Sequence, residues 1–304
     1  TLENTGNFAI LDRVRSRAEI AERIGRGEAR AAIVIPPDYA SDVKRGRTAR
    51  AQVIVDAADP MASSAAISGA AMVGQARSLE LLESRGMRAR APLELRVRPW
   101  YNPALETSTY IVPGIVGVLL TLTMVLITSM SIVRERERGT LEQLVVTPID
   151  KTSLMLGKII PFVLVGYVQM TVVLGLGKLL FDIPIRGSLT ALYGIAFAFI
   201  VPSLGVGLFL STLVRTQAQA IQLGFFFLLP NILLSGFMFP REAMPEAAQW
   251  IGAALPLTYF LEVLRGVLLR GVGLDALWRE ALALILFSVL LVAFSVRKFQ
   301  KTLE

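Results

Sequence analysis

The sequence contains neither cysteine nor histidine among its 304 residues. Without cysteine, the chain has no disulfide framework, no thiol nucleophile and no thiolate metal site. Without histidine, it lacks the commonest acid–base group, and carboxylates are the main metal ligands that remain. These absences argue against triad, thiol or zinc chemistry.

Motifs for nucleotide and hydrolase chemistry are also missing. A phosphate-binding loop needs G-x-x-x-x-G-K-[ST], and the nearest stretch, G-L-G-K-L-L at residues 175–180, lacks both the spacing and the hydroxyl. Asp56 and Asp59 could form a metal pair, but Asp and Pro after a strand favour a turn. We therefore predict no catalytic residue, no metal site and no cofactor bound by this chain, which is not expected to be an enzyme.

Charged residues are scarce and apolar residues abundant. Only 18% of residues are charged, 54% are hydrophobic, and the mean hydropathy is +0.58. These values indicate an integral membrane protein. The net charge of +7 comes without a basic stripe interleaved with aromatics, and membrane proteins are often basic, so we expect no nucleic-acid partner.

The charges concentrate in the first third of the chain. Residues 1–105 carry 16 Lys or Arg and 12 Asp or Glu. Short apolar or alternating runs predict strands at 31–36, 52–56 and 93–97, and a long helix is expected at 60–84. Residues 1–105 are thus predicted to form a water-exposed α/β domain.

Residues 106–304 form the predicted transmembrane domain. Five stretches are long enough to cross the roughly 30 Å hydrocarbon core of a bilayer as helices. They lie at residues 108–133, 154–180, 189–214, 220–239 and 277–296. Lys and Arg in the connections and the C-terminal tail favour an orientation with residues 1–105 outside and the C-terminus in the cytoplasm. The bias is modest, because the outside loops would also carry Arg186, Arg241, Arg265 and Arg270.

A charge-dense segment, R-E-R-E-R-G-T-L-E-Q-L-V-V-T-P at residues 134–148, follows the first of these spans. Thr140 and Gln143 have the spacing of a capping box, and Pro148 ends the short helix that follows. Leu141 and Leu144 fall on one face of it, as expected of a docking surface. The alternative interpretation is a headgroup anchor followed by a polar loop.

The run E-R-G-T-L-E-Q-L-V-V-T-P resembles the signature of permeases of type-2, drug-efflux ATP-binding-cassette (ABC) exporters. Residues 256–271, P-L-T-Y-F-L-E-V-L-R-G-V-L-L-R-G, also resemble that family. The resemblance implies that residues 134–148 contain the coupling helix, which inserts into a groove of a separate ATPase subunit. The expected contact residues are Glu137, Gly139, Thr140, Leu141, Glu142, Leu144, Thr147 and Pro148.

The resemblance implies a function and a set of partners. The chain would be the membrane subunit of an exporter that moves a hydrophobic or amphipathic compound out of the cytoplasm, across a bacterial inner membrane. Its partners would be an ABC ATPase, which holds ATP and magnesium, and a second permease in a homo- or heterodimer; a periplasmic adaptor is a further candidate. An alternative is a non-transporting signalling or mechanical protein that acts on an extracytoplasmic partner.

The same resemblance implies a span before residue 1, whereas the alternative is a five-span protein that starts there. It also bears on residues 240–273, whose two helical pieces, about 244–255 and 257–270, are each too short to cross a bilayer. We expect a re-entrant hairpin in the outer leaflet that bends at Pro256. An extracytoplasmic gate would involve Pro256, Glu262, Arg265 and Gly266, with an intrahelical Glu262–Arg265 ion pair; simple headgroup anchoring is the alternative.

Polar residues inside the spans are the remaining candidates, because they normally face a bundle interior or a cavity. They could line a substrate path or only join helices by hydrogen bonds. The five residues selected for a path are Thr121, Thr128, Gln169, Gln222 and Asn231.

Overall fold

The computed structural model describes residues 9–45, 47–58, 60–85, 93–140 and 151–302. The chain divides into two compact units, Thr1–Tyr110 and Ile111–Glu304. Each unit has hydrophobic clusters of its own, so each is described separately.

The first unit is built on a three-stranded sheet. Its strands are β1 (Ala31–Val34), β2 (Ala49–Asp56) and β3 (Leu93–Trp100), in the order β1-β2-β3. The central strand β2 is antiparallel to β1 and parallel to β3. All three strands expected from the sequence are present, and β2 starts three residues earlier than predicted because the alternation continues through Ala49 and Ala51, which are both buried.

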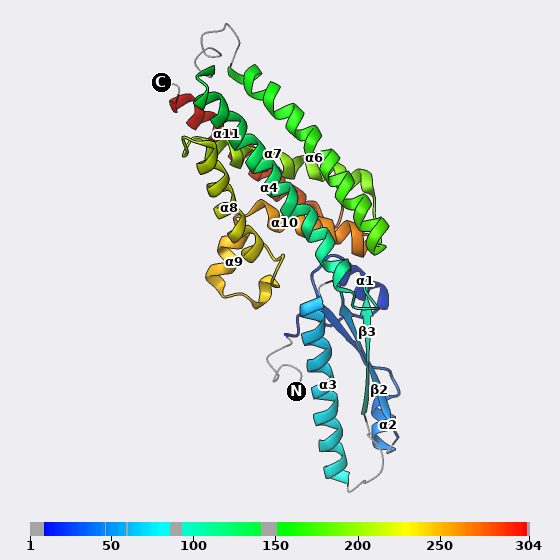
Figure 1. Ribbon diagram of the computed structural model, residues 1–304. Coiled ribbons are helices and arrows are strands. Elements are labelled where there is room, and N and C mark those ends of the chain that lie inside the picture. The colour runs from blue at the N-terminus through cyan, green and yellow to red at the C-terminus, as the bar shows by residue number, and fades with distance from the viewer. Residues whose placement is uncertain (1–8, 46, 59, 86–92, 141–150, 303–304) are drawn as a thin grey trace. The chain divides into compact units, whose positions relative to one another are not determined.

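Helices cover both faces of this sheet (Figure 1). Ile54 of β2 packs with Ile20 and Ile24 of α1 (Arg17–Gly25), while its neighbours Val53 and Val55 face α3 (Pro60–Arg85). This is the period of two that a strand imposes on its side chains. A short helix, α2 (Tyr39–Lys44), lies between β1 and β2 in the chain.

The second unit is entirely helical in the part that the structure describes. Its helices are α4 (Thr107–Glu137), α6 (Lys151–Phe181), α7 (Leu189–Ser211), α8 (Gln217–Leu234), α9 (Glu246–Ala253), α10 (Pro256–Arg265), the π-helical turn η3 (Gly266–Arg270) and α11 (Trp278–Thr302). Helix α7 is the most enclosed, because α6, α8, α10 and α11 all pack against it (Figure 1). The core of the unit therefore lies along α7.

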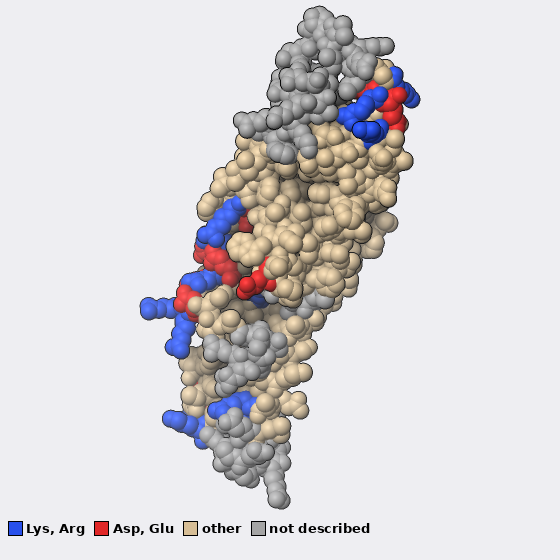
Figure 2. Space-filling view, turned by 90° about the vertical axis from the view of Figure 1, so that its left-hand side faces the viewer, with Lys and Arg blue, Asp and Glu red and all other residues tan. Residues whose placement is uncertain are grey.

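Several of these helices are suited to a membrane. Among the described residues, α4, the stretch Ile159–Phe181 of α6, α7 and α8 are long and apolar enough to cross a bilayer. Figure 2 shows a broad band of surface without any Lys, Arg, Asp or Glu side chain. Large apolar side chains are exposed along α6 and α8, for example Leu164 and Phe226. The unit is that of a polytopic membrane protein, and the fifth predicted span, residues 277–296, lies in α11.

The predicted hairpin corresponds to α9 and α10, which are bent by 85° at a short break. Pro256 is the first residue of α10, as expected from its fixed φ and missing N–H. Several helix ends differ from the prediction, and two of the differences follow from backbone geometry. Helix α8 stops at Leu234, before residue 239, because Gly236 adopts a φ of +88° and turns the chain; after Arg265 the helix widens into the π-helical turn η3.

Candidate functional site

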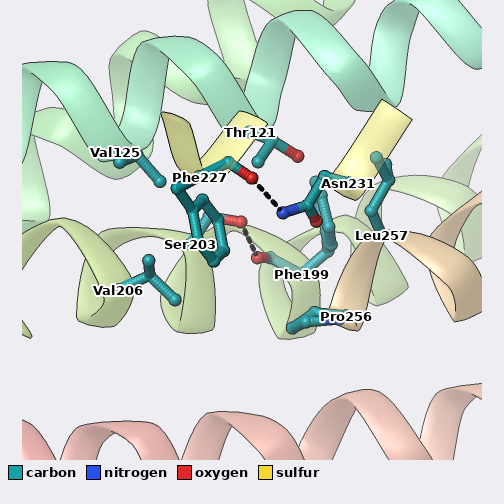
Figure 3. Close-up of a pocket in the computed structure, with 9 residues that line it drawn as sticks. All are labelled: Thr121, Val125, Phe199, Ser203, Val206, Phe227, Asn231, Pro256 and Leu257. Carbon is teal, nitrogen blue, oxygen red and sulfur yellow. Dashed lines mark hydrogen bonds between the residues drawn. The ribbon is translucent and has the colours of Figure 1, made fainter. Parts of the chain in front are cut away.

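A small pocket of about 10 Å³, close to the space that one water molecule needs, lies inside the second unit between helices α4, α7, α8 and α10 (Figure 3). Most of its lining is apolar. The lining residues are Thr121, Val125, Phe199, Ser203, Val206, Phe227, Asn231, Pro256 and Leu257. Each of the three polar residues comes from a different helix, so the pocket has a polar group on three of its sides.

The three polar side chains share one hydrogen-bond pattern. The Thr121 hydroxyl donates to the Gly117 carbonyl four residues earlier, at 2.9 Å. Ser203 donates in the same way to Phe199, and the Asn231 amide nitrogen to Phe227, each at 2.9 Å (Figure 3). A hydroxyl that donates to its own helix keeps its lone pairs as acceptors. The pocket is therefore an apolar niche whose hydroxyl groups can accept hydrogen bonds.

Of the five residues that the sequence proposed for a substrate path, two line the pocket. The structure brings Thr121 and Asn231 together in the pocket, where their exposed fractions are 4% and 1%. Thr128, two helical turns further along α4, is also buried, and its hydroxyl has no hydrogen-bond partner among the described residues. Gln169 instead donates to the Thr123 hydroxyl at 2.9 Å, and Gln222 is exposed on α8.

Sequence reasoning missed Ser203, the third polar residue of the pocket. It is one of the few polar residues within α7, and it follows Pro202. Its burial, at 4% exposed, would have been expected from the rule that polar residues in spans face the interior. The signal was present but was not used.

The hairpin residues proposed as a gate have mixed positions. Pro256 is buried and lines the pocket, while the Arg265 side chain donates to the Gly236 carbonyl at 3.1 Å, beyond the end of α8. Glu262 forms its ion pair with Arg270, at 3.8 Å between Oε2 and Nη1. Gly266 is also buried, and an added Cβ would lie 2.9 Å from Leu277. The hairpin is thus held to α8 by Arg265 and contributes one wall of the pocket.

The charge-dense segment begins at the last turn of α4. Gly139 has a φ of +70°, a left-handed conformation that ends the helix. Among the described residues beyond its chain neighbours, no atom lies within 4 Å of the position its Cβ would take. Thr140 donates its hydroxyl proton to the Glu135 carbonyl at 3.2 Å. The other predicted contact residues, Leu141, Glu142, Leu144, Thr147 and Pro148, lie outside the described residues.

Two side chains at this end of α4 contact the next connection in the bundle. Arg136 donates to the carbonyls of Ser211 and Val214, both at 2.9 Å. Glu137 accepts hydrogen bonds from the backbone and the side-chain nitrogen of Gln217, at 2.9 and 2.5 Å. The end of α4 is thereby joined to the connection between α7 and α8.

Comparison with known proteins decides the family. Residues 1–297 match the family described as ABC-2 family transporter protein. The chain belongs to the ABC-2 transporter family. It is 31% identical over 291 residues to the probable multidrug ABC transporter permease YbhS of Escherichia coli K12, covering 95% of this chain and 77% of that protein.

Two further ABC-2 relatives from Escherichia coli K12 show comparable similarity. The probable multidrug ABC transporter permease YbhR is 32% identical over 267 residues, which is 88% of this chain and 72% of the relative. The inner membrane transport permease YhhJ is 31% identical over 285 residues, 90% of this chain and 73% of the relative. The chain is thus the membrane subunit of an ABC transporter and a multi-pass membrane protein.

Members of the ABC-2 family are permease subunits of ABC transporters. Among the described residues, no three Asp or Glu side chains gather in a group that could hold a metal ion. The candidate functional features of the described residues are the pocket between α4, α7, α8 and α10 and the polar contacts at the end of α4.

Proposed function

We propose that this ABC-2 permease exports hydrophobic or amphipathic compounds from the cytoplasm, driven by a separate ATPase subunit and paired with a second permease. The pocket is the observation that carries the proposal. Apolar walls with three polar side chains suit a compound that is mainly apolar and has a few N–H or O–H donors. The word "multidrug" in the names of YbhS and YbhR agrees with such a substrate class.

The size of the pocket limits its role. Sites for drug-sized ligands have volumes of about 300–1,000 Å³, whereas this pocket, of about 10 Å³, has room for about one water molecule. In this conformation it would not hold the transported compound; it would mark the place where four helices separate when a wider path opens during transport. Because Pro256 and Leu257 form one wall, movement of the α9–α10 hairpin would open or close this niche.

The drive would come from the segment at residues 134–148. A docked helix of this segment would receive nucleotide-driven motion from the ATPase by direct contact, with Glu142, Leu141 and Leu144 as predicted contacts. The proposed orientation places this segment and the C-terminus in the cytoplasm of a bacterial cell and residues 1–105 outside. A periplasmic adaptor bound to residues 1–105 would be a further partner.

The export function is tested with inside-out membrane vesicles that contain the chain and its ATPase. ATP-dependent uptake of ethidium, a fluorescent amphipathic cation with N–H donors, is measured. We expect uptake with the wild type and a change in the apparent KM for ethidium in Thr121→Val and Asn231→Leu, because both alter the pocket lining. Thr171→Val is the matched control, since this threonine is exposed on α6, away from the pocket.

The outcomes separate the alternatives. Equal effects of the Thr171 and Asn231 substitutions would remove the pocket from the substrate path. ATP hydrolysis by an assembled complex that moves neither ethidium nor a panel of neutral amphipathic dyes would favour the mechanical or signalling alternative over export.

A further inference from the structure

Two adjacent side chains in the last turn of α4 contact the ends of two other helices. Arg136 donates to the carbonyls of Ser211, the last residue of α7, and Val214. Glu137 accepts from the backbone N–H of Gln217, the first residue of α8. One residue pair on α4 therefore contacts both α7 and α8.

The charges of this pair match the helix ends that they contact. The last carbonyls of a helix carry partial negative charge and the first N–H groups carry partial positive charge. Arg136 places a cation at the C-terminus of α7, and Glu137 places an anion at the N-terminus of α8. Arg134 adds a bond from its Nε to the side-chain oxygen of Gln217, at 3.3 Å.

The pair lies where a displacement of residues 141–148 would enter the bundle. Glu137 is the last residue of α4, and Gly139 turns the chain two residues later with a φ of +70°. Arg136 and Glu137 are thus among the last side chains on this route that contact other helices of the bundle. Helices α7 and α8 lead directly to Ser203 and Asn231 of the pocket.

The contacts of Glu137 are too exposed to be important for stability, whereas those of Arg136 are half-buried. Glu137 and Gln217 form their bonds at the surface, and polar pairs between exposed groups contribute little to folding. Buried packing already joins this end of α4 to its neighbours, because Val133 of α4 clusters with Val214 of the α7–α8 connection and Ala220 of α8. A role in transmitting motion explains an oriented, charge-matched set of bonds at this place better than a role in stability.

We infer that Arg136 and Glu137 are positioning residues that transmit displacement of the ATPase-bound segment to α7 and α8, rather than contacts to the ATPase itself. This inference rests on the proposed function, because it assumes that residues 134–148 dock on an ATPase. It makes the connection between α7 and α8 part of the transmission route. Glu137, which the resemblance places among the ATPase contacts, then acts within the permease.

The test uses Arg136→Ala, Glu137→Ala and the exchanged pair Glu137→Gln with Gln217→Glu. The exchange keeps an acceptor for the Gln217 backbone N–H and a donor–acceptor pair between the side chains. Arg279→Ala is the control, since this arginine is also exposed but lies outside residues 134–148. Each variant is purified with its ATPase, and ATP hydrolysis and ethidium uptake are measured in vesicles.

A second readout does not depend on the substrate. Gln222 is exposed on α8 and the chain has no cysteine, so Gln222→Cys gives a single thiol reporter on the driven helix. Its labelling rate with N-ethylmaleimide is compared between nucleotide-free and vanadate-trapped complexes. In the reporter background with Arg136 and Glu137 intact, the rate is expected to change on trapping.

We expect Arg136→Ala and Glu137→Ala to retain the ATPase and its hydrolysis but to lose the trapping-dependent change in labelling. Their ethidium uptake should fall by about fivefold, as is typical of coupling substitutions. Recovery of the labelling change and of ethidium uptake in the exchanged pair, with both unchanged in Arg279→Ala, supports the inference. Loss of the ATPase from Glu137→Ala, or an undiminished labelling change, overturns it. If the protein with Arg136 and Glu137 intact showed the labelling change but no ethidium uptake, export would be rejected and the transmission route would remain.

Discussion

The hydroxyl of Ser288 on α11 donates a hydrogen bond of 2.8 Å to the carbonyl of Ala198 on α7. Ala198 lies four residues before Pro202, which has no N–H to give to that carbonyl. In hydrocarbon no water is available to replace the missing donor, so a neighbouring helix has to supply it. Ser288 thereby joins α7 and α11, two helices that pack closely together, at the point where proline interrupts the hydrogen bonding of α7.

Ser288→Ala is predicted to destabilise the protein by leaving the Ala198 carbonyl without this donor. A lost hydrogen bond of this kind costs about 0.6–1.5 kcal/mol. The expected result is a Tm lower by about 2–4 °C, measured by thermal unfolding in detergent.

The Pro202→Ala background provides the control, because alanine restores an N–H that can donate to Ala198 within α7. The cost of Ser288→Ala should be smaller there than in the wild type. Equal costs in both backgrounds would show that Ser288 acts through its second bond, to the Leu284 carbonyl at 2.9 Å, or through packing.

The secondary structure of this protein was largely predictable because its signals are local. A short apolar run placed β2, period-two alternation placed β3, and continuous apolar runs placed the long membrane helices. Pro256 marked the break between α9 and α10. The end of α8 was not predicted, because the apolar run continues past Gly236, where the backbone turns with a φ of +88°. Local composition indicates an element more reliably than its last residue.

The site was less predictable than the elements, and the reason is physical. A helix in lipid is apolar on nearly all sides, so its sequence does not show which side faces the bundle. Thr121 and Gln169 are equally plausible as path residues by composition, but the structure places one in the pocket and bonds the other to Thr123. The roles of Arg136 and Glu137 depend on contacts made 75 to 80 residues away in the chain, which no local pattern contains.

Gly207 of α7 is predicted to tolerate no side chain. A Cβ at this position would lie 2.6 Å from the Val125 carbonyl oxygen and 2.9 Å from the Cβ of Thr128, so Gly207→Ala would force α4 and α7 apart. Overpacking of this kind costs about 1–3 kcal/mol. Lower Tm and reduced yield of folded protein in detergent are the expected results.

Gly194→Ala, also in α7, is the matched control for Gly207→Ala. No atom lies within 4 Å of its added Cβ, and alanine is the better helix former by up to about 1 kcal/mol. Unchanged or higher Tm is expected. If the two alanine variants had the same Tm, close contact between α4 and α7 at Gly207 would be disproved.

The partner of Glu262 is predicted to be Arg270. The side chain of Arg270 is 3% exposed and that of Glu262 32% exposed, so the pair is partly removed from water. Glu262→Arg and Arg270→Glu should each cost about 1–3 kcal/mol, less than a fully buried pair, because water reaches the carboxylate. The charge-exchanged double variant should recover part of both stability and ethidium uptake.

The comparison pair for this exchange is Glu262→Arg with Arg265→Glu, since Arg265 donates to the Gly236 carbonyl. Glutamate at position 265 cannot make that bond, so the second exchange should recover less than the first. Equal recovery of stability and uptake in the two exchanges would show that Glu262 pairs with Arg265, as their spacing in the sequence predicts. Wild-type uptake in all single variants would leave the hairpin as an anchor rather than a gate.

The orientation in the membrane is tested by single cysteine substitutions, which are informative because the chain has no cysteine of its own. Met72 in α3 is 68% exposed and Trp250 in α9 is 77% exposed, so a thiol at either site is open to a reagent on its own side of the membrane. Arg138 marks the segment that the positive-inside rule assigns to the cytoplasm. An impermeant maleimide should therefore label Met72→Cys and Trp250→Cys in intact spheroplasts, and Arg138→Cys only after lysis. Labelling of Arg138→Cys before lysis, with Met72→Cys and Trp250→Cys protected, would show the opposite orientation. Labelling of Met72→Cys alone before lysis would place the hairpin on the cytoplasmic side.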